Sequence, residues 1–189
     1  IAGSLPSTSG GVIYSYYGGN HTSPRAAGLP LGLIPRGRPL TLAALRRLPP
    51  FDRQTNRDLG RLVPWGPGPF GHQVATVGHG GQPALVRTAI LSALGAGMPA
   101  PPGPVLWVDL YDLLTPLLRV GGLLSRRLGW VGPGQALIVR ALEGIRPRLE
   151  RRVAGVLAEL ARQAGFARVL SPDGSAGQVW YTRPQPDEG

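Results

Sequence analysis

Runs of apolar residues alternate with amphipathic segments along most of the chain, and this alternation predicts strands followed by helices. A nearly continuous apolar run of the kind found in buried parallel strands occupies residues 105–110. An apolar and aromatic run at residues 12–17 and a mixed run at residues 72–77 predict two further strands. Each of these runs leads into a segment with helical spacing of its apolar residues. The alternation of strands and helices predicts an α/β layered sandwich with a mainly parallel sheet, of a P-loop-like or Rossmann-like type.

The boundaries of the predicted helices are marked by capping residues. Helices are expected over residues 23–33, 42–48, 82–94, 115–128 and 143–164. Thr41 and Thr115 are candidate N-caps, and Gly95 and Gly129 follow two of the final turns. Residues 136–139 predict a short fourth strand, whereas the Pro- and Gly-rich residues 63–71 predict a loop. Residues 166–170 and 178–182 flank an Asp-Gly turn and predict a C-terminal β-hairpin.

The chain is long enough for one domain with a sizeable core, at 189 residues. We expect a flexible lead-in at residues 1–10, the α/β domain at residues 11–165, and a hairpin extension with a tail at residues 166–189. The lead-in lacks the basic and apolar regions of a signal peptide, and no apolar run is long enough to span a bilayer. A cytoplasmic location without a membrane partner is therefore expected.

The junction between the first strand and the first helix carries the clearest chemical signal. Residues 17–24 read Tyr-Gly-Gly-Asn-His-Thr-Ser-Pro: a glycine turn, then hydroxyl residues that can cap a helix, then Pro at its first position. The free amides of such a helix start and the positive end of its dipole point to one spot. An anion site for a phosphate or carboxylate is predicted here, formed by Gly18, Gly19, Asn20, Thr22 and Ser23.

Two residues are candidates for chemistry at this site. His21 lies within the turn and is a candidate acid, base or partial positive charge. Asp109 ends the third strand as a Walker-B aspartate does, where it would hold Mg²⁺ opposite Thr22. A cap on the next turn, or an ion pair with Arg119, explains Asp109 equally well. Phosphoryl transfer or hydrolysis through His21 and Asp109 fits this layout, but these residues do not establish catalysis.

Two further segments are candidates for the same pocket. A second glycine turn, His79-Gly80-Gly81, follows the second strand and would form the opposite wall, although a plain connector explains it as well. Arg126 and Arg127 carry guanidinium forks that clamp phosphate with paired hydrogen bonds. A solvated pair at a helix C-terminus is the alternative for both arginines.

Composition narrows the possible chemistry. The net charge is +10 and all 20 basic side chains are Arg, which suits anionic ligands including nucleic acid, although GC-rich codon usage accounts for it too. The absence of Cys and Lys excludes cysteine nucleophiles, thiolate metal sites and a PLP-binding lysine. Three His without metal-ligand spacing make zinc unexpected. Asp52 and Asp58 are expected to form structural ion pairs with Arg53, Arg57 or Arg61.

Four stretches, in order, resemble an uncharacterised bacterial family catalogued as domain of unknown function 3189, known mostly from spore-forming Firmicutes. Residues 14–23 are similar to its Tyr-x-x-Tyr-Gly-Gly-x-His-Ser-Ser signature, and residues 48–55 to its Phe-Asp-Lys-x-Thr segment. Residues 70–78 resemble its Phe-Gly-x-x-Val strand. Residues 106–109 and 119–129 resemble its Val-Asp and Arg-Ile-Gly-Gly-Phe-Leu-Ser-Arg-Arg-Leu-Gly blocks. The resemblance covers about residues 11–152 and implies no established activity.

The chain departs from the family pattern after the third strand. Where members have a Pro and an Asn, this sequence has Tyr111-Asp112 and Thr115. The leading expectation is a binder of a phosphorylated small molecule or nucleotide, with Mg²⁺ accompanying a nucleotide. A non-catalytic regulatory or scaffold protein of the sporulation programme and an Arg-rich nucleic-acid binder are the alternatives.

Overall fold

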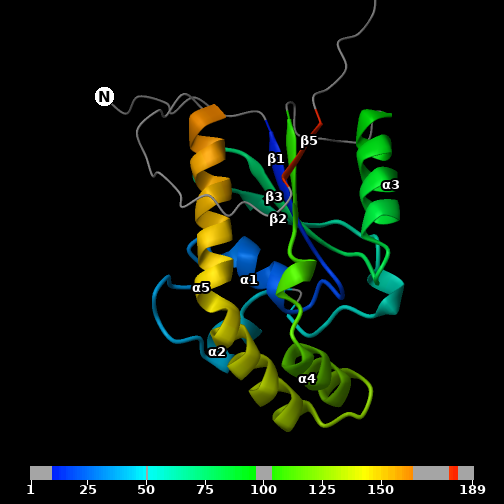
Figure 1. Cartoon of the computed structure of the whole chain (residues 1–189), viewed down its shortest axis with the longest axis vertical. Coiled ribbons are helices and arrows are strands. Elements are labelled where there is room, and N and C mark those ends of the chain that lie inside the picture. The colour runs from blue at the N-terminus through cyan, green and yellow to red at the C-terminus, as the bar shows by residue number, and fades with distance from the viewer. Residues whose placement is uncertain (1–9, 50, 97–103, 164–178, 183–189) are drawn as a thin grey trace, which may run out of the picture.

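A mixed sheet forms the centre of the computed structural model, which describes residues 10–49, 51–96, 104–163 and 179–182. Within these residues the sheet has five strands in the order β2-β3-β1-β4-β5 (Figure 1). The middle strands β1 (Gly11–Tyr16), β3 (Gln73–Gly78) and β4 (Val105–Asp109) run parallel. The edge strands β2 (Val63–Pro67) and β5 (Val179–Thr182) run antiparallel to their neighbours. The predicted α/β fold with a mainly parallel sheet is confirmed.

Helices lie on both sides of the sheet, α5 (Val131–Gln163) on one side and α3 (Pro83–Gly95) on the other (Figure 1). The short α1 (Thr22–Gly28) is buried along its whole length on the same side as α5. The remaining helical elements are α2 (Leu42–Arg46), α4 (Pro116–Arg126) and the 3-10 turns η1 (Asn56–Asp58) and η2 (Tyr111–Leu113). Among the described helices, none combines the length and apolarity needed to cross a bilayer.

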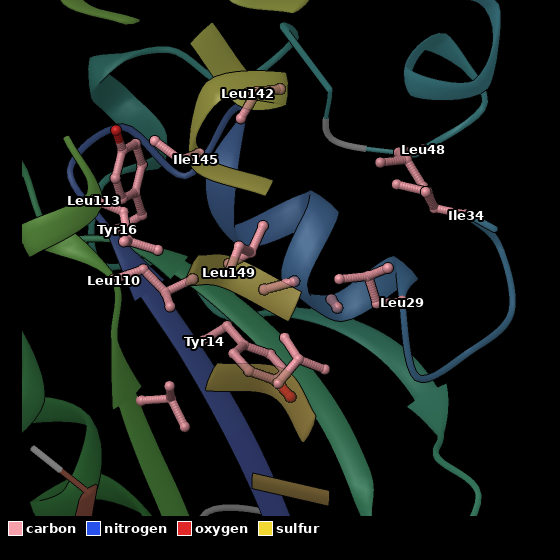
Figure 2. Close-up of a cluster of buried hydrophobic side chains, with 14 of the residues drawn as sticks. Tyr14, Tyr16, Leu29, Ile34, Leu48, Leu110, Leu113, Leu142, Ile145 and Leu149 are labelled. Atoms are coloured by element: carbon pink, nitrogen blue, oxygen red, sulfur yellow. The ribbon is translucent and has the colours of Figure 1, made fainter. Parts of the chain in front are cut away.

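The side chains of β1 alternate between two hydrophobic clusters, as a strand covered on both faces requires. Tyr14 and Tyr16 pack in the cluster that contains α1 and α5, whereas Ile13 packs in the cluster that contains α3. Figure 2 shows the two tyrosine rings beside Ile145 and Leu149 of α5. Burial on both faces explains why β1 appears in the sequence as a continuous apolar run.

Two local predictions are wrong. Residues 136–139, expected to form a fourth strand, lie within α5, where Ile138 is fully buried and faces Gly121 of α4. Residues 63–71, expected to be a loop, contain β2. A Pro-containing segment can pair there because β2 is an edge strand with hydrogen bonds on one side only, and its register shifts between Pro64 and Gly66.

The predicted C-terminal hairpin is described in one half only. Residues 166–170 lie outside the described residues, as do residues 1–9 of the expected lead-in. The second half of the hairpin corresponds to β5, which pairs antiparallel with β4. The pairing within the hairpin and the domain boundaries stay predictions.

Candidate functional site

The two glycine turns predicted from the sequence lie against each other at the carboxyl edge of β1 and β3. We name residues 18–20 the first glycine turn and residues 79–81 the second. The amide of Gly80 donates to the carbonyl of Tyr17 at 2.8 Å. A Cβ at Gly78 would lie 2.9 Å from the carbonyl carbon of Gly18, so this close backbone approach requires glycine. The sheet edge therefore presents both turns side by side.

The first glycine turn is braced from the segment that follows α2. Gly19 has φ +68°, and a Cβ there would collide with the side chain of Gln54. Asn20 donates from Nδ2 to the Gln54 carbonyl at 3.0 Å and accepts from the Gln54 amide at 2.7 Å. Within the part of the chain that the structure describes, the amides of Gly18, Gly19 and Asn20 donate no hydrogen bond. The turn is thus held by side-chain contacts, and its own backbone donors have no acceptor in the described residues. Gly19 is buried, whereas Gly18 and Asn20 are partly exposed.

Asp52 is the centre of a polar network beside this turn. Its carboxylate accepts from Ser125 Oγ at 2.6 Å and from Gln135 Nε2 at 3.0 Å, and it lies 3.4 Å from His21 Nε2. Burial favours the neutral carboxyl, but the hydrogen bonds from His21, Ser125 and Gln135 outweigh it and lower the pKa of Asp52 to about 2. The ionised carboxylate is therefore stabilised by donors from three separate elements.

The backbone of Asp52 is also held in an uncommon conformation. Its φ is +53°, in the left-handed region that non-glycine residues rarely adopt. The guanidinium of Arg126 donates to the carbonyls of Asp52 and Gln54, and Asp52 donates its amide to the carbonyl of Asn20 at 3.3 Å. These contacts fix the segment whose side chains orient His21.

His21 is restrained on several sides. Its Nε2 faces the Asp52 carboxylate, its ring meets Phe51 edge-on with centroids 5.6 Å apart, and a Cβ at Gly122 would lie 3.6 Å from its Cε1. Because a carboxylate only accepts, Nε2 carries a proton in this pair. Nδ1 is then an acceptor in neutral His21 and a donor in its doubly protonated form.

Asp109 belongs to a second cluster, with His79. Asp109 Oδ1 accepts from the amide of Tyr111 at 2.9 Å and lies 3.8 Å from His79 Nε2. His79 Nδ1 accepts from the Gly81 amide at 3.3 Å, and burial lowers the pKa of His79 against the opposing effect of Asp109. Asp109 thus caps the turn that follows β4, which is one of the three roles expected from the sequence.

The sequence comparison assigns a family. The model of the family described as "Protein of unknown function (DUF3189)" matches residues 11–157. The chain belongs to this family. The match extends from β1 into α5 and includes both glycine turns and the whole Asp52 network. No curated protein and no solved structure matches the chain.

His21 and Asp109, which the sequence predicts to act at one site, lie in different clusters of this DUF3189 chain. His21 contacts Asp52, whereas Asp109 contacts His79; in the described residues no contact joins His21 to Asp109. Arg126 donates into the Asp52 network, whereas no contact in the described residues joins Arg127, the residue after α4, to this network; both arginines are exposed.

The hydroxyls of the DUF3189 signature point inward. Thr22 and Ser23 have 0% exposure, and the Ser23 hydroxyl has no hydrogen-bond partner in the described part of the chain. Burial raises the pKa of Tyr16 to about 12, against the lowering effect of the Thr22 hydroxyl beside it. The described residues contain no group of three or more His, Asp or Glu that could hold a metal ion. Magnesium binding by Thr22 and Asp109 stays a prediction.

Sequence reasoning missed the role of Asp52. We expected this residue to pair with neighbouring arginines, but its side chain contacts His21, Ser125 and Gln135, which lie far from it in the chain. The available signals were the Phe-Asp segment and the Ser-Arg-Arg block, both of which resemble DUF3189 motifs. Each motif contributes one partner of a contact that only the folded chain brings together.

Proposed function

We propose that this chain binds a phosphorylated small molecule or nucleotide at the first glycine turn. The observation that carries the proposal is the set of backbone amides at residues 18–20, which have no acceptor in the described part of the chain. They lie at the carboxyl edge of a parallel sheet, where ligands of α/β folds bind. Helix α1 has seven residues, so the proposal rests on the turn amides rather than on a helix dipole.

His21 and the charge of the chain support the same ligand class. The ring of His21 is held by an ionised carboxylate. Its Nδ1 can donate a hydrogen bond to a bound oxyanion in the doubly protonated form of the imidazole. The net charge of +10 raises the local concentration of anions around the protein. An acid–base activity is an extension of this proposal, in which His21 transfers the proton and Asp52, rather than Asp109, orients it.

Calorimetric titration with pyrophosphate, ADP and a sugar phosphate, each with and without Mg²⁺, tests the proposal. Gly18→Val is the informative variant, because a Cβ there meets only Asn20 Nδ2, at an ordinary 3.7 Å, and shields the amides without a clash. Gly144→Val is the matched control on α5, where a Cβ meets nothing within 4 Å. The wild type and the control should bind alike, and Gly18→Val at least about tenfold more weakly. Equal binding by Gly18→Val, or no binding of any of these ligands, contradicts the proposal.

A non-catalytic regulatory or scaffold protein is a second candidate, and one surface favours it. Several exposed apolar side chains follow one another along α4, the connection to α5 and the first residue of α5: Val120, Leu123, Leu128, Trp130 and Val131. Such a patch is typical of protein interaction surfaces. Sedimentation of the wild type and of a Leu128→Ser, Trp130→Ser double variant tests association with a second copy. Association that only the wild type shows supports this candidate, and a wild-type monomer at all concentrations contradicts it. The link to sporulation and the cytoplasmic location stay predictions.

A further inference from the structure

Three aromatic rings form a small platform next to the first glycine turn. The rings of Tyr17 and Tyr111 are stacked, with centroids 6.2 Å apart and planes 23° apart. His79 meets both edge-on, at 6.4 Å and 83° from Tyr17 and at 5.3 Å and 72° from Tyr111. The His79 side chain is completely buried, whereas Tyr17 is 46% exposed and Tyr111 is 36% exposed. The platform therefore has a buried base and an exposed aromatic face.

The platform is held in place from three strand ends. Tyr17 follows β1, His79 follows β3, and Tyr111 opens η2 after β4. The backbone of Tyr111 is tied to Asp109 Oδ1, and the His79 ring is tied to the Gly81 amide. An aromatic surface fixed in this way can accept a flat ligand ring with little loss of side-chain freedom.

The exposed tyrosine is adjacent to the proposed anion site. Tyr17 directly precedes Gly18, and a Cβ at Gly81 would lie 3.5 Å from its Cε2, so the ring extends over the second glycine turn. Adjacent residues of an extended chain lie about 3.5 Å apart, so one nucleotide is long enough to contact both Tyr17 and Gly18. A sugar phosphate offers only the anionic end of such a ligand, whereas a nucleotide offers both the anion and a ring.

We infer that the ligand is a nucleotide whose base stacks on Tyr17 while its phosphates bind the amides of the first glycine turn. The inference rests on the function proposed above and narrows its ligand class. Stacking uses the π-face that every base has, so the platform by itself predicts little discrimination between bases. Removal of one stacked aromatic ring weakens nucleic-acid binding by about tenfold or more in comparable cases.

Calorimetry with ADP and ribose 5-phosphate separates the inference from the proposal beneath it. The wild type should bind ADP at least about tenfold more tightly than ribose 5-phosphate. Tyr17→Ala should lose this advantage, so that its affinities for ADP and ribose 5-phosphate become similar, whereas Tyr17→Phe, which keeps the ring, should retain it. Melting curves establish that the variants are folded. In the wild type, nuclear Overhauser contacts should join adenine protons to the Tyr17 ring, a readout that requires no variant.

The outcomes that overturn the inference are distinct. Equal affinity of the wild type for ADP and ribose 5-phosphate, or full ADP affinity in folded Tyr17→Ala, overturns base stacking and leaves the anion site standing. Bound ADP without contacts to the Tyr17 ring does the same. Failure of both ligands to bind the wild type overturns the proposed function and this inference together.

Discussion

The imidazole Nε2 of His21 lies 3.4 Å from the carboxylate Oδ1 of Asp52, although 31 positions in the chain separate the two residues. The same carboxylate binds Ser125 of α4 and Gln135 of α5. The orientation of His21 therefore depends on how the α4–α5 helix pair packs beside the sheet edge. Substitutions in the Asp52 network, as well as in the first glycine turn, therefore test the proposed site.

Asp52→Asn should lower the free energy of unfolding by about 1–3 kcal/mol, because three buried donors lose a charged acceptor. Asn has a similar size and tolerates the left-handed backbone conformation, so the substitution isolates the effect of the charge. Urea titration measures the change. Asp112→Asn is the control: its carboxylate is half exposed and pairs with Arg152, so its effect should be much smaller. Equal stabilities of Asp52→Asn and the wild type would contradict the proposed network.

Two glycines of α5 should respond in opposite directions to alanine. A Cβ at Gly134 would lie 2.5 Å from the amide nitrogen of Ser125 and 2.8 Å from the Gly121 carbonyl oxygen, so α4 must move and carry Ser125 away from Asp52. Gly134→Ala should destabilise the chain despite the higher helix propensity of alanine. Gly144→Ala, with nothing within 4 Å, should stabilise it by up to about 1 kcal/mol. Urea unfolding compares the two, and stabilisation by both is the contradictory outcome.

The pH dependence of stability should report His72. Its ring is fully buried, and burial lowers its pKa from 6.5 to about 4. Between these values the unfolded chain binds more protons than the folded chain, so this contribution is complete above pH 6.5 and is lost as the pH falls toward 4. The loss reaches about 3 kcal/mol at most. His79, whose pKa is also lowered, adds to it with the same sign.

Unfolding free energies measured between pH 7.5 and pH 5 test this prediction. The wild type should lose stability steadily below pH 6.5, and His72→Gln should flatten much of that decline. Equal wild-type stability at pH 7.5 and pH 5 would show that neither buried histidine resists protonation.

Local patterns predicted much of the fold. The buried strand β1, the glycine turn after it and the Thr115 cap depend on residues close together in sequence, and the Thr115 hydroxyl does accept from the Leu118 amide at 3.2 Å. The prediction of a strand at residues 136–139 is wrong because a short apolar run fits a strand and a buried helix face equally well. Contact between Ile138 and α4 decides that choice, and no local pattern encodes this contact.

The site was predictable only where it is local. The first glycine turn was found because its residues are contiguous. The partners of Asp52 come from the residue before α1, from α4 and from α5, and no local pattern connects them. The sequence alone therefore predicts pairing with neighbouring arginines. The difference between Arg126 and Arg127 follows from helix phase relative to Asp52, which requires the packed structure.

The most direct test is a nitrogen-15 NMR titration of the wild-type chain with ADP, which follows each backbone amide separately. The account predicts that the largest and saturable shift changes occur at Gly18, Gly19 and Asn20, with smaller changes at the flanking Tyr17 and His21. Unchanged amides at these positions, with shifts confined to exposed arginines elsewhere on the surface, would contradict an anion site at the first glycine turn.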